Sequence, residues 1–268
     1  MKNKFLILLY IFTFTFAIKG YTTECGKYSF NNDWLLKVGD IPDAQKSQFK
    51  DDDWSKVTLP RAFNEDEAFK VSIEQLTDTV MWYRKHFKLP KTAKGKKVFI
   101  EFEGVRQGAD FYLNGKHIGL HENGVMAVGF DLTPYLNFTG ENVIAVRTND
   151  WKYKERATGS RYQWNDNNFN VNYGGIPKNV WLHITDKLYQ TLPLYSNLRT
   201  TGVYIYATDI CTKSRKAFVN AESEVRNEYD KSCNVSYEVC VYDYDGNWVS
   251  TFKSAPVIVK SKETVKLK

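Results

Sequence analysis

Residue types that could do chemistry gather in one stretch without sustained periodicity, Asp150 to Gly175 (DWKYKERATGSRYQWNDNNFNVNYGG). Loops longer than about 12–15 residues are uncommon in compact domains and are usually functional or disordered. This stretch sets aromatic rings beside short amide and carboxylate side chains: Trp151, Tyr153, Tyr162, Trp164, Phe169 and Tyr173, with Asn165, Asp166, Asn167, Asn168, Asn170 and Asn172.

Such a mixture suits a ligand that has one apolar face and a polar edge. A pyranose presents rows of C–H groups to a flat ring, and its hydroxyls need both hydrogen-bond donors and acceptors. Composition supports a second interpretation equally well, in which the rings pin the loop to a sheet and the Asn residues serve turns. The segment is therefore a candidate sugar-binding loop, with a structural loop as the alternative.

Other arrangements of functional groups give weaker signals. His117 and His121 are spaced as zinc ligands on a helix would be, but they follow the turn dipeptide Asn114-Gly115 and so belong to a strand. Four residues of strand span about 13 Å, too far for two ligands about 2 Å from one ion. Asp51–Asp53 could bind calcium but is also a typical solvated turn. Gly174-Gly175 lacks the following helix pattern of a phosphate loop. We predict no cofactor and no metal site.

The elements that would hold the loop are strands. Asn114-Gly115 between two strand-like runs is a strong hairpin signal, because both turn positions need a positive φ. Further strand patterns surround it: Trp82–Leu89, Val98–Glu103, Asp110–Leu113, Lys116–Leu120, Val143–Thr148 and Val180–Thr185. The few helix-like patches, such as Ser72–Leu76 and Thr133–Leu136, are a turn or two at most. Many strands without a convincing helix indicate a sandwich, jelly roll or barrel.

A domain boundary is expected near Asp186–Asn197, where Leu192-Pro193 interrupts the strand pattern. Beyond it the chain resembles an immunoglobulin-like sandwich, which needs about seven strands. Six runs fit: Val203–Thr208, Ala217–Arg226, Val235–Tyr242, Trp248–Phe252, Val257–Lys260 and Thr264–Leu267. We therefore predict an all-β chain, with a jelly-roll sandwich over residues 21–186 and an incomplete immunoglobulin-like sandwich over 187–268.

Residues 1–20 have the pattern of a secretory signal peptide. Lys2 and Lys4 precede an apolar run, Phe5–Ala17, that is too short to span a bilayer comfortably. An uncleaved anchor is the alternative. The pattern predicts a secreted or periplasmic protein with no membrane span after signal removal.

Charge and cysteine content exclude two further classes. The net charge is +6, but half of this excess comes from the three lysines in the first twenty residues, and no basic stripe for nucleic acid is present. Four cysteines are too few for a disulfide scaffold. Cys233 and Cys240 would face opposite sides of one strand, which leaves Cys211 bridged to one of them, or small core hydrophobes, as the alternatives.

A set of phrases occurs in an order that resembles the N-terminal sugar-binding jelly roll of glycoside hydrolase family 2, the β-galactosidase and β-glucuronidase family. The likeness runs from about Tyr28 to Asp186, and a less specific one to the family's immunoglobulin-like second domain begins at Thr201. The phrases include Phe30-Asn31-Asn32-Asp33-Trp34, Asp53-Trp54, Val57–Pro60, Trp82–Lys85, Glu103-Gly104-Val105, Tyr112–Gly115, Phe130–Thr133, Gly140–Asn142 and Gly174-Gly175-Ile176.

The resemblance implies which residues would touch the sugar. In the family, the segment before the Gly-Gly-Ile phrase enters the active site, and an Asp lies seven residues before the Ile. This chain has Phe169 there, so Asp166, Asn168 or Asn170 would supply the polar group, and Asn172 is a further candidate. A second contact comes from the loop Arg61–Glu67, where Asn64 is the candidate and a solvated acidic turn is the alternative.

The resemblance also implies that the catalytic residues lie elsewhere. In the family both catalytic Glu residues come from a C-terminal barrel, and such a barrel takes about 250 residues. We therefore expect a substrate-shaping, non-catalytic part of an exported β-galactosidase-like hydrolase, with a carbohydrate substrate and the barrel of the same protein as partners. A free-standing carbohydrate-binding module and a structural pair of sandwiches without a ligand are the alternatives.

Overall fold

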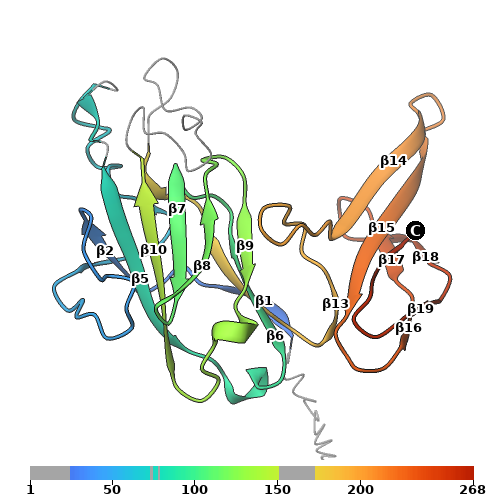
Figure 1. The fold of residues 1–268 in the computed structure, drawn as a ribbon. Coiled ribbons are helices and arrows are strands. Elements are labelled where there is room, and N and C mark those ends of the chain that lie inside the picture. Colours follow the sequence, from blue (N-terminus) through green and yellow to red (C-terminus); the bar gives the residue numbers. More distant parts are fainter. Residues whose placement is uncertain (1–24, 73–74, 78, 151–172) are drawn as a thin grey trace, which may run out of the picture.

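The chain folds into two β-structures. The computed structural model describes residues 25–72, 75–77, 79–150 and 173–268. Their regular structure is made of strands, apart from short 3-10 turns such as η2 (Lys91–Ala93) and η3 (Thr133–Tyr135), which confirms the predicted all-β class. Figure 1 shows the two structures side by side, the first coloured blue to yellow and the second orange to red. Within this described part, no helix has the length and apolarity needed to cross a membrane.

The first structure is a sandwich of two antiparallel sheets. The six-stranded sheet has the order β3-β2-β5-β10-β7-β8, and its strands are β2 (Trp34–Val38), β3 (Ser55–Val57), β5 (Val80–Lys88), β7 (Gly108–Leu113), β8 (Lys116–His121) and β10 (Glu141–Asn149). The four-stranded sheet has the order β1-β12-β6-β9, with β1 (Gly26–Ser29), β6 (Lys97–Phe102), β9 (Val128–Asp131) and β12 (Val180–Thr185). A small third sheet pairs β4 (Arg61–Ala62) with β11 (Gly175–Ile176).

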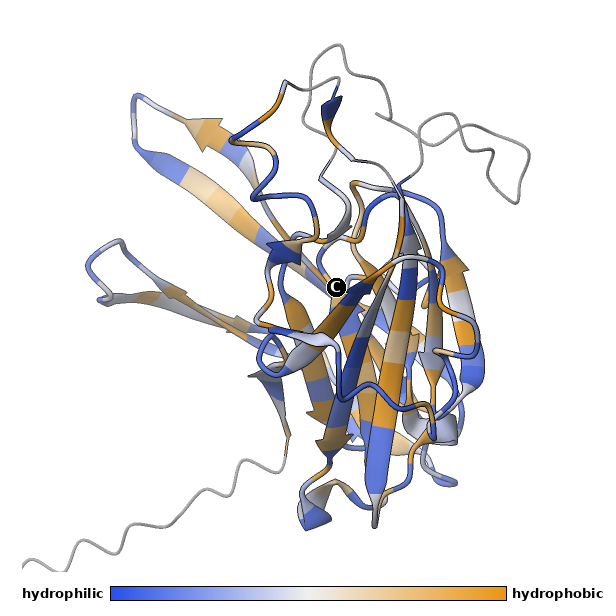
Figure 2. Ribbon diagram, turned by 90° about the vertical axis from the view of Figure 1, so that its left-hand side faces the viewer, coloured by the Kyte–Doolittle hydropathy of each residue, from blue (hydrophilic) through white to orange (hydrophobic). Residues whose placement is uncertain are grey.

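Side-chain alternation along the strands builds the core between the two sheets. Ile100 and Phe102 of β6 meet Ile144 and Val146 of β10 in one buried cluster, because residues two apart on a strand point to the same face. Figure 2 shows hydrophobic residues alternating with hydrophilic ones on the strands of the sandwich.

The outer face of the six-stranded sheet is buried as well. A second apolar cluster joins Trp82 of β5 and Ala145 of β10 to Ala44 and Trp54 from the connection between β2 and β3. Arg84, fully buried, anchors this cover through a 2.6 Å hydrogen bond from its Nε to Asp51. Burial alone would raise the pKa of Asp51, but hydrogen bonds and positive charge from Arg84 and His86 hold it below its ordinary value.

The predicted Asn114-Gly115 hairpin is confirmed. β7 pairs with β8 across this turn, and Asn114 and Gly115 have φ values of 51° and 80°. The two histidines of β8 have separate partners: His117 lies 3.0 Å from Asp110, and His121 lies 3.2 Å from the carbonyl oxygen of Met126.

The second structure is built on β15 (Lys216–Asn227). One edge of β15 pairs with β13 (Leu188–Gln190) and β14 (Val203–Cys211), and the other edge pairs with β20 (Thr264–Leu267). Two small sheets complete it, namely β16 (Cys233–Val235) with β19 (Val257–Val259), and β17 (Glu238–Tyr242) with β18 (Trp248–Lys253).

One strand prediction for this region is wrong. The single strand Val235–Tyr242 is two strands with different partners, because the chain leaves the ladder at Ser236 and Tyr237. Cys233 and Cys240 therefore lie on separate strands. All four cysteines are free, and Cys25, Cys211 and Cys240 are exposed, so these three are not the small core hydrophobes expected of an unbridged cysteine.

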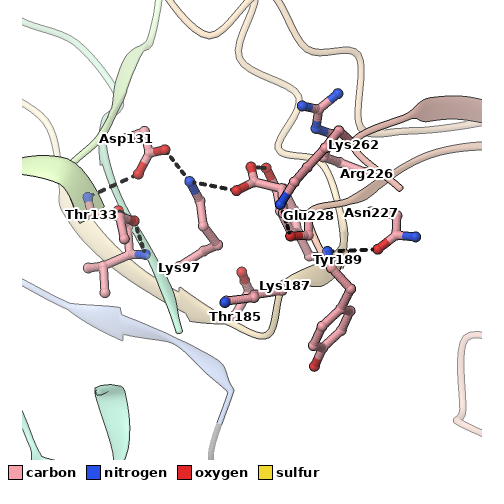
Figure 3. Close-up of polar contacts among 12 residues, drawn as sticks. Lys97, Asp131, Thr133, Thr185, Lys187, Tyr189, Arg226, Asn227, Glu228 and Lys262 are labelled. Carbon is pink, nitrogen blue, oxygen red and sulfur yellow. Dashed lines mark hydrogen bonds and ion pairs between the residues drawn. The ribbon is translucent and has the colours of Figure 1, made fainter. Parts of the chain in front are cut away.

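A lysine connects the two structures. The ammonium group of Lys97 in β6 pairs with Asp131 of β9 and, at 3.2 Å, with Glu228 just after β15 (Figure 3). Glu228 also accepts a 2.9 Å hydrogen bond from the hydroxyl of Tyr189, whose ring packs on Phe99 of β6 with centroids 5.3 Å apart. The relative position of the two structures is thus fixed by a mixed polar and aromatic contact.

Candidate functional site

The candidate site is the end of the jelly roll where β5 begins and β10 ends, drawn uppermost in Figure 1. Residues 61–69, 77, 79, 150 and 173–177, here called the rim, surround the two points at which segment 151–172 leaves and rejoins the sandwich. The rim is held by β4 and β11, which pair Ala62 with Gly175 and Arg61 with Ile176.

Backbone hydrogen bonds fix both ends of that segment. Asp150 follows β10 and is fully buried; its carboxylate accepts a 2.7 Å hydrogen bond from the N–H of Thr79, and its own N–H donates to the Thr79 carbonyl at 3.2 Å. On the returning side, Gly175 exchanges two backbone hydrogen bonds with Arg106, at 2.9 and 3.0 Å. The segment therefore starts and ends at points fixed to the rigid sheets.

The Gly174-Gly175 pair is required by close packing. A Cβ atom on Gly174 would overlap the carboxylate of Asp150 and the ring of Phe63. A Cβ on Gly175, whose φ is +100°, would overlap the phenol of Tyr83. That phenol donates a 2.7 Å hydrogen bond to the carbonyl of Arg61, and burial raises the pKa of Tyr83 above its ordinary value. Any other residue at these two positions would push the rim apart.

Asn64 joins three parts of the rim. It is buried, at 2% exposure. Its Oδ1 accepts a 3.2 Å hydrogen bond from the N–H of Gly174, and its Nδ2 donates to the carbonyl of Thr77 at 3.1 Å. The structure therefore gives Asn64 a role in positioning the rim, while its predicted contact with a sugar stays a prediction.

The acidic loop after β4 is organised by Arg61. The guanidinium pairs with Glu65 and, at 2.6 Å, with Asp66, and the other carboxylate oxygen of Glu65 accepts from the N–H of Ala62 at 2.9 Å. The hydrogen bond and the charge of Arg61 lower the pKa of Asp66. Glu67 continues the pattern by accepting hydrogen bonds from both the N–H and the hydroxyl of Thr77, at 2.9 and 2.8 Å.

The rim encloses a shallow hollow of about 400 Å³. Its lining combines aromatic, acidic and apolar groups: Ala62, Glu65, Asp66, Phe69, Tyr173 and Pro177. Phe69 is 87% exposed, so its ring is accessible at the hollow. Rings beside carboxylate acceptors suit sugar hydroxyls and C–H faces.

The paired rim carboxylates Glu65 and Asp66 differ from the pair of acids that breaks a glycosidic bond. A glycosidase needs one carboxylic acid held protonated by a raised pKa, opposite a second carboxylate. Asp66 instead has a lowered pKa, and the single positive charge of Arg61 is shared between Glu65 and Asp66. Within the described ranges, no group of three or more His, Cys, Asp and Glu side chains could hold a metal ion.

Most of the predicted sugar contacts cannot be placed. Asp166, Asn168, Asn170 and Asn172 lie outside the described residues. The structure adds residues that the sequence reasoning did not single out, above all Tyr83, Asp150 and Phe69. In the sequence, Asp150 and Tyr83 look like ordinary residues at the end and in the middle of a strand. Phe69 is a single aromatic residue in a polar loop, and nothing in the sequence marks it as part of a site.

The fold and the rim together define the class of protein. It is a pair of antiparallel β-sandwiches, and the first sandwich holds both ends of a long segment. Residues 40–186 match the family model described as "Glycosyl hydrolases family 2, sugar binding domain". This match covers more than half of the chain, which therefore belongs to glycoside hydrolase family 2, as the resemblance in the sequence predicted.

Relatives extend the likeness beyond the matched range. The chain is 42% identical over 233 residues to a β-glucuronidase of Formosa agariphila, covering 84% of this chain and 23% of that enzyme. It is 38% identical over 158 residues to a β-galactosidase of Thermoanaerobacter pseudethanolicus, covering 58% and 20%. A solved β-glucuronidase from family 2 superposes with a TM-score of 0.81 at 38% identity, covering 91% of this chain and 26% of that one. The chain thus spans about a quarter of the length of these relatives.

Proposed function

We propose that this chain is the N-terminal, non-catalytic part of a β-galactosidase- or β-glucuronidase-like glycoside hydrolase, in which the rim walls one side of the substrate pocket. The observation that carries the proposal is the rim itself, a rigid frame of buried hydrogen bonds holding both ends of an aromatic and amide-rich segment. The family membership gives the ligand class, since the matched family model is that of a sugar-binding domain.

The bond-breaking carboxyl groups belong to another part of the protein in this proposal. The relatives are about four times as long as the matched chain, which leaves ample length for a barrel of about 250 residues. The barrel and a β-linked carbohydrate substrate are the proposed partners. The rim would orient the sugar, which raises the rate by positioning even though it supplies no acid.

Asp166, Asn168, Asn170 and Asn172 are the proposed sugar contacts. In the longer enzyme, Asp166→Ala, Asn170→Ala and Asn172→Ala should each weaken substrate handling about 5- to 100-fold, because a lost hydrogen bond to a bound ligand costs about 1–3 kcal/mol. Thermal unfolding of each variant serves as the control for folding. Parent-like turnover in all three variants would show that the segment is structural.

The location of the chemistry can be tested separately. Purified residues 21–268 should not hydrolyse aryl β-galactosides or β-glucuronides above the rate of a longer enzyme whose catalytic acid has been removed. Turnover above that control, abolished by one Asp or Glu substitution within this chain, would place the chemistry here. A stop codon directly after Lys268 in the gene would favour a free-standing carbohydrate-binding module.

Export is proposed from the first twenty residues. N-terminal sequencing of the protein from the periplasm or medium should show a start near residue 21, and recovery of an intact N-terminus from the cytoplasm would contradict the proposal.

A further inference from the structure

A second hollow lies on the second sandwich, far along the chain from the rim. Its volume is about 200 Å³, below the 300–1,000 Å³ of pockets for drug-sized ligands, so it is matched to one small ring. We call it the tyrosine slot, lined by Tyr195, Thr201, Gly202, Tyr204, Glu222 and Lys266.

Strand register places the slot on the outer face of the sheet. Tyr204 of β14 lies opposite Glu222 of β15, and Glu224, two residues on, lies opposite Lys266 of β20. Directly paired residues share a face, and so do residues two apart, so all four side chains project from the same side. Ala221, Ser223 and Val225 of β15 project from the opposite side and are buried, although Ile205, the partner of Ala221, is 56% exposed. The slot is therefore separate from the interior of the sandwich.

Two tyrosines form the walls of the slot, and both are 62% exposed. Tyr204 stacks on Tyr206 with ring centroids 5.0 Å apart and an angle of 28° between the rings. This stacking covers one face of Tyr204 and holds the ring in place, which leaves the other face for the slot. Tyr195 comes from the connection between β13 and β14, which extends towards β9 of the first sandwich in Figure 1, where Ser196 bridges to Val128.

The connection that carries Tyr195 is tied to the sheet. The N–H of Thr201 donates to the carboxylate of Glu224 at 3.0 Å, and the N–H of Gly202 donates to the hydroxyl of Thr191 at 3.1 Å. The Thr191 hydroxyl in turn donates to Glu224 at 2.8 Å. A wall fixed in this way loses little conformational entropy when a ligand binds.

Polar groups around the rings supply both kinds of hydrogen bond. Lys266 is exposed at the slot and offers N–H donors, while the carboxylate of Glu222, 3.0 Å from the ammonium group of Lys268, keeps free lone pairs as acceptors. Ring faces beside hydrogen-bond donors and acceptors suit a pyranose better than a purely apolar partner.

We propose that the tyrosine slot binds a single pyranose unit of an oligosaccharide or polysaccharide, as a second carbohydrate site apart from the rim. The choice of a sugar rests on the proposed function, because membership of a sugar-handling family makes carbohydrate the ligand class. A site of this kind would hold a polymer close to the protein while the rim handles the unit that is cleaved.

The test is affinity electrophoresis of purified residues 21–268. The gels contain either a neutral β-galactan or the anionic polymer hyaluronan. Retardation by either polymer should weaken about tenfold in Tyr204→Ala and Tyr195→Ala, as expected for loss of an aromatic contact. Tyr204→Phe, which keeps the ring, should retain most of the binding. Tyr244→Ala is the matched control, because Tyr244 is fully exposed and outside the slot.

Several results would overturn the proposal. The first is the absence of retardation by both polymers, and the second is an equal loss of retardation in Tyr244→Ala. The third is retardation that Lys266→Gln abolishes and Tyr204→Ala leaves intact, because this pattern would indicate simple charge attraction. Equal thermal midpoints show that a variant is folded. Asn170→Ala and Asn172→Ala should not change retardation through the slot, so failure of the rim assignment and failure of this inference give different results.

Discussion

Replacing Asn64 by Ala separates two roles for this residue. The amide side chain joins the N–H of Gly174 to the carbonyl of Thr77 in a site only 2% exposed. Alanine would leave the buried N–H of Gly174 without this partner, whereas Thr77 is exposed and its carbonyl can turn to water. A buried group left unsatisfied costs about 1–3 kcal/mol. We expect the free energy of unfolding to fall by about this amount, which lowers the thermal midpoint by roughly 2–12 °C in a domain of this size.

Urea unfolding of the chain, followed by tryptophan fluorescence, measures this change. Asn137→Ala is the matched control, because Asn137 is exposed and, among the described residues, its side-chain Oδ1 accepts only from Thr139 and Gly140 in its own turn. Its loss should cost under about 1 kcal/mol. If Asn64→Ala unfolds like the parent while the longer enzyme binds substrate more weakly, Asn64 is a sugar ligand and its positioning role is wrong.

Three further predictions concern charge and pH. Asp51→Asn should destabilise the jelly roll by about 2–3 kcal/mol at neutral pH. Because folding lowers the pKa of Asp51, the parent should lose this stabilisation as the pH falls below about 4, which acid unfolding curves would measure. Burial raises the pKa of Tyr83, so the unfolded state ionises first and the parent should lose stability as the pH rises above about 10; Tyr83→Phe should flatten this loss in alkaline unfolding curves. A double-mutant cycle of Lys97→Met and Glu228→Gln should give a coupling of about 1 kcal/mol, and zero coupling would remove Lys97 as a link between the sandwiches.

Local signals in the sequence predicted the strands well. Asn114 and Gly115 readily adopt the positive φ values that the turn requires, so the hairpin could be placed without knowing the rest of the fold. The order of the family phrases predicted the jelly roll.

Features that depend on distant contacts were harder to predict. The cover over the outer face of the six-stranded sheet is built from Ala44 and Trp54, which lie in an irregular connection with no periodicity. The break between β16 and β17 follows from pairing with two different partners, which no local pattern reveals. The family resemblance predicts Asn64 as a sugar contact, while its hydrogen bonds to Thr77 and to the distant Gly174 leave no local signal in the sequence.

Under the proposed function, the packing around Gly174 and Gly175 gives a non-catalytic domain a way to affect catalysis. A long segment that contacts a sugar loses conformational entropy on binding unless its ends are already fixed. Here one end is fixed through Asp150 and Thr79, and the other through Gly175 and Arg106, both inside the sandwich. Because a displacement of about 1 Å in a positioning group can cost about 100-fold in rate, a substitution at either glycine should impair the enzyme as much as loss of a direct sugar contact. The most sensitive positions of this domain are therefore the buried ones that hold the segment, and they need not touch the substrate.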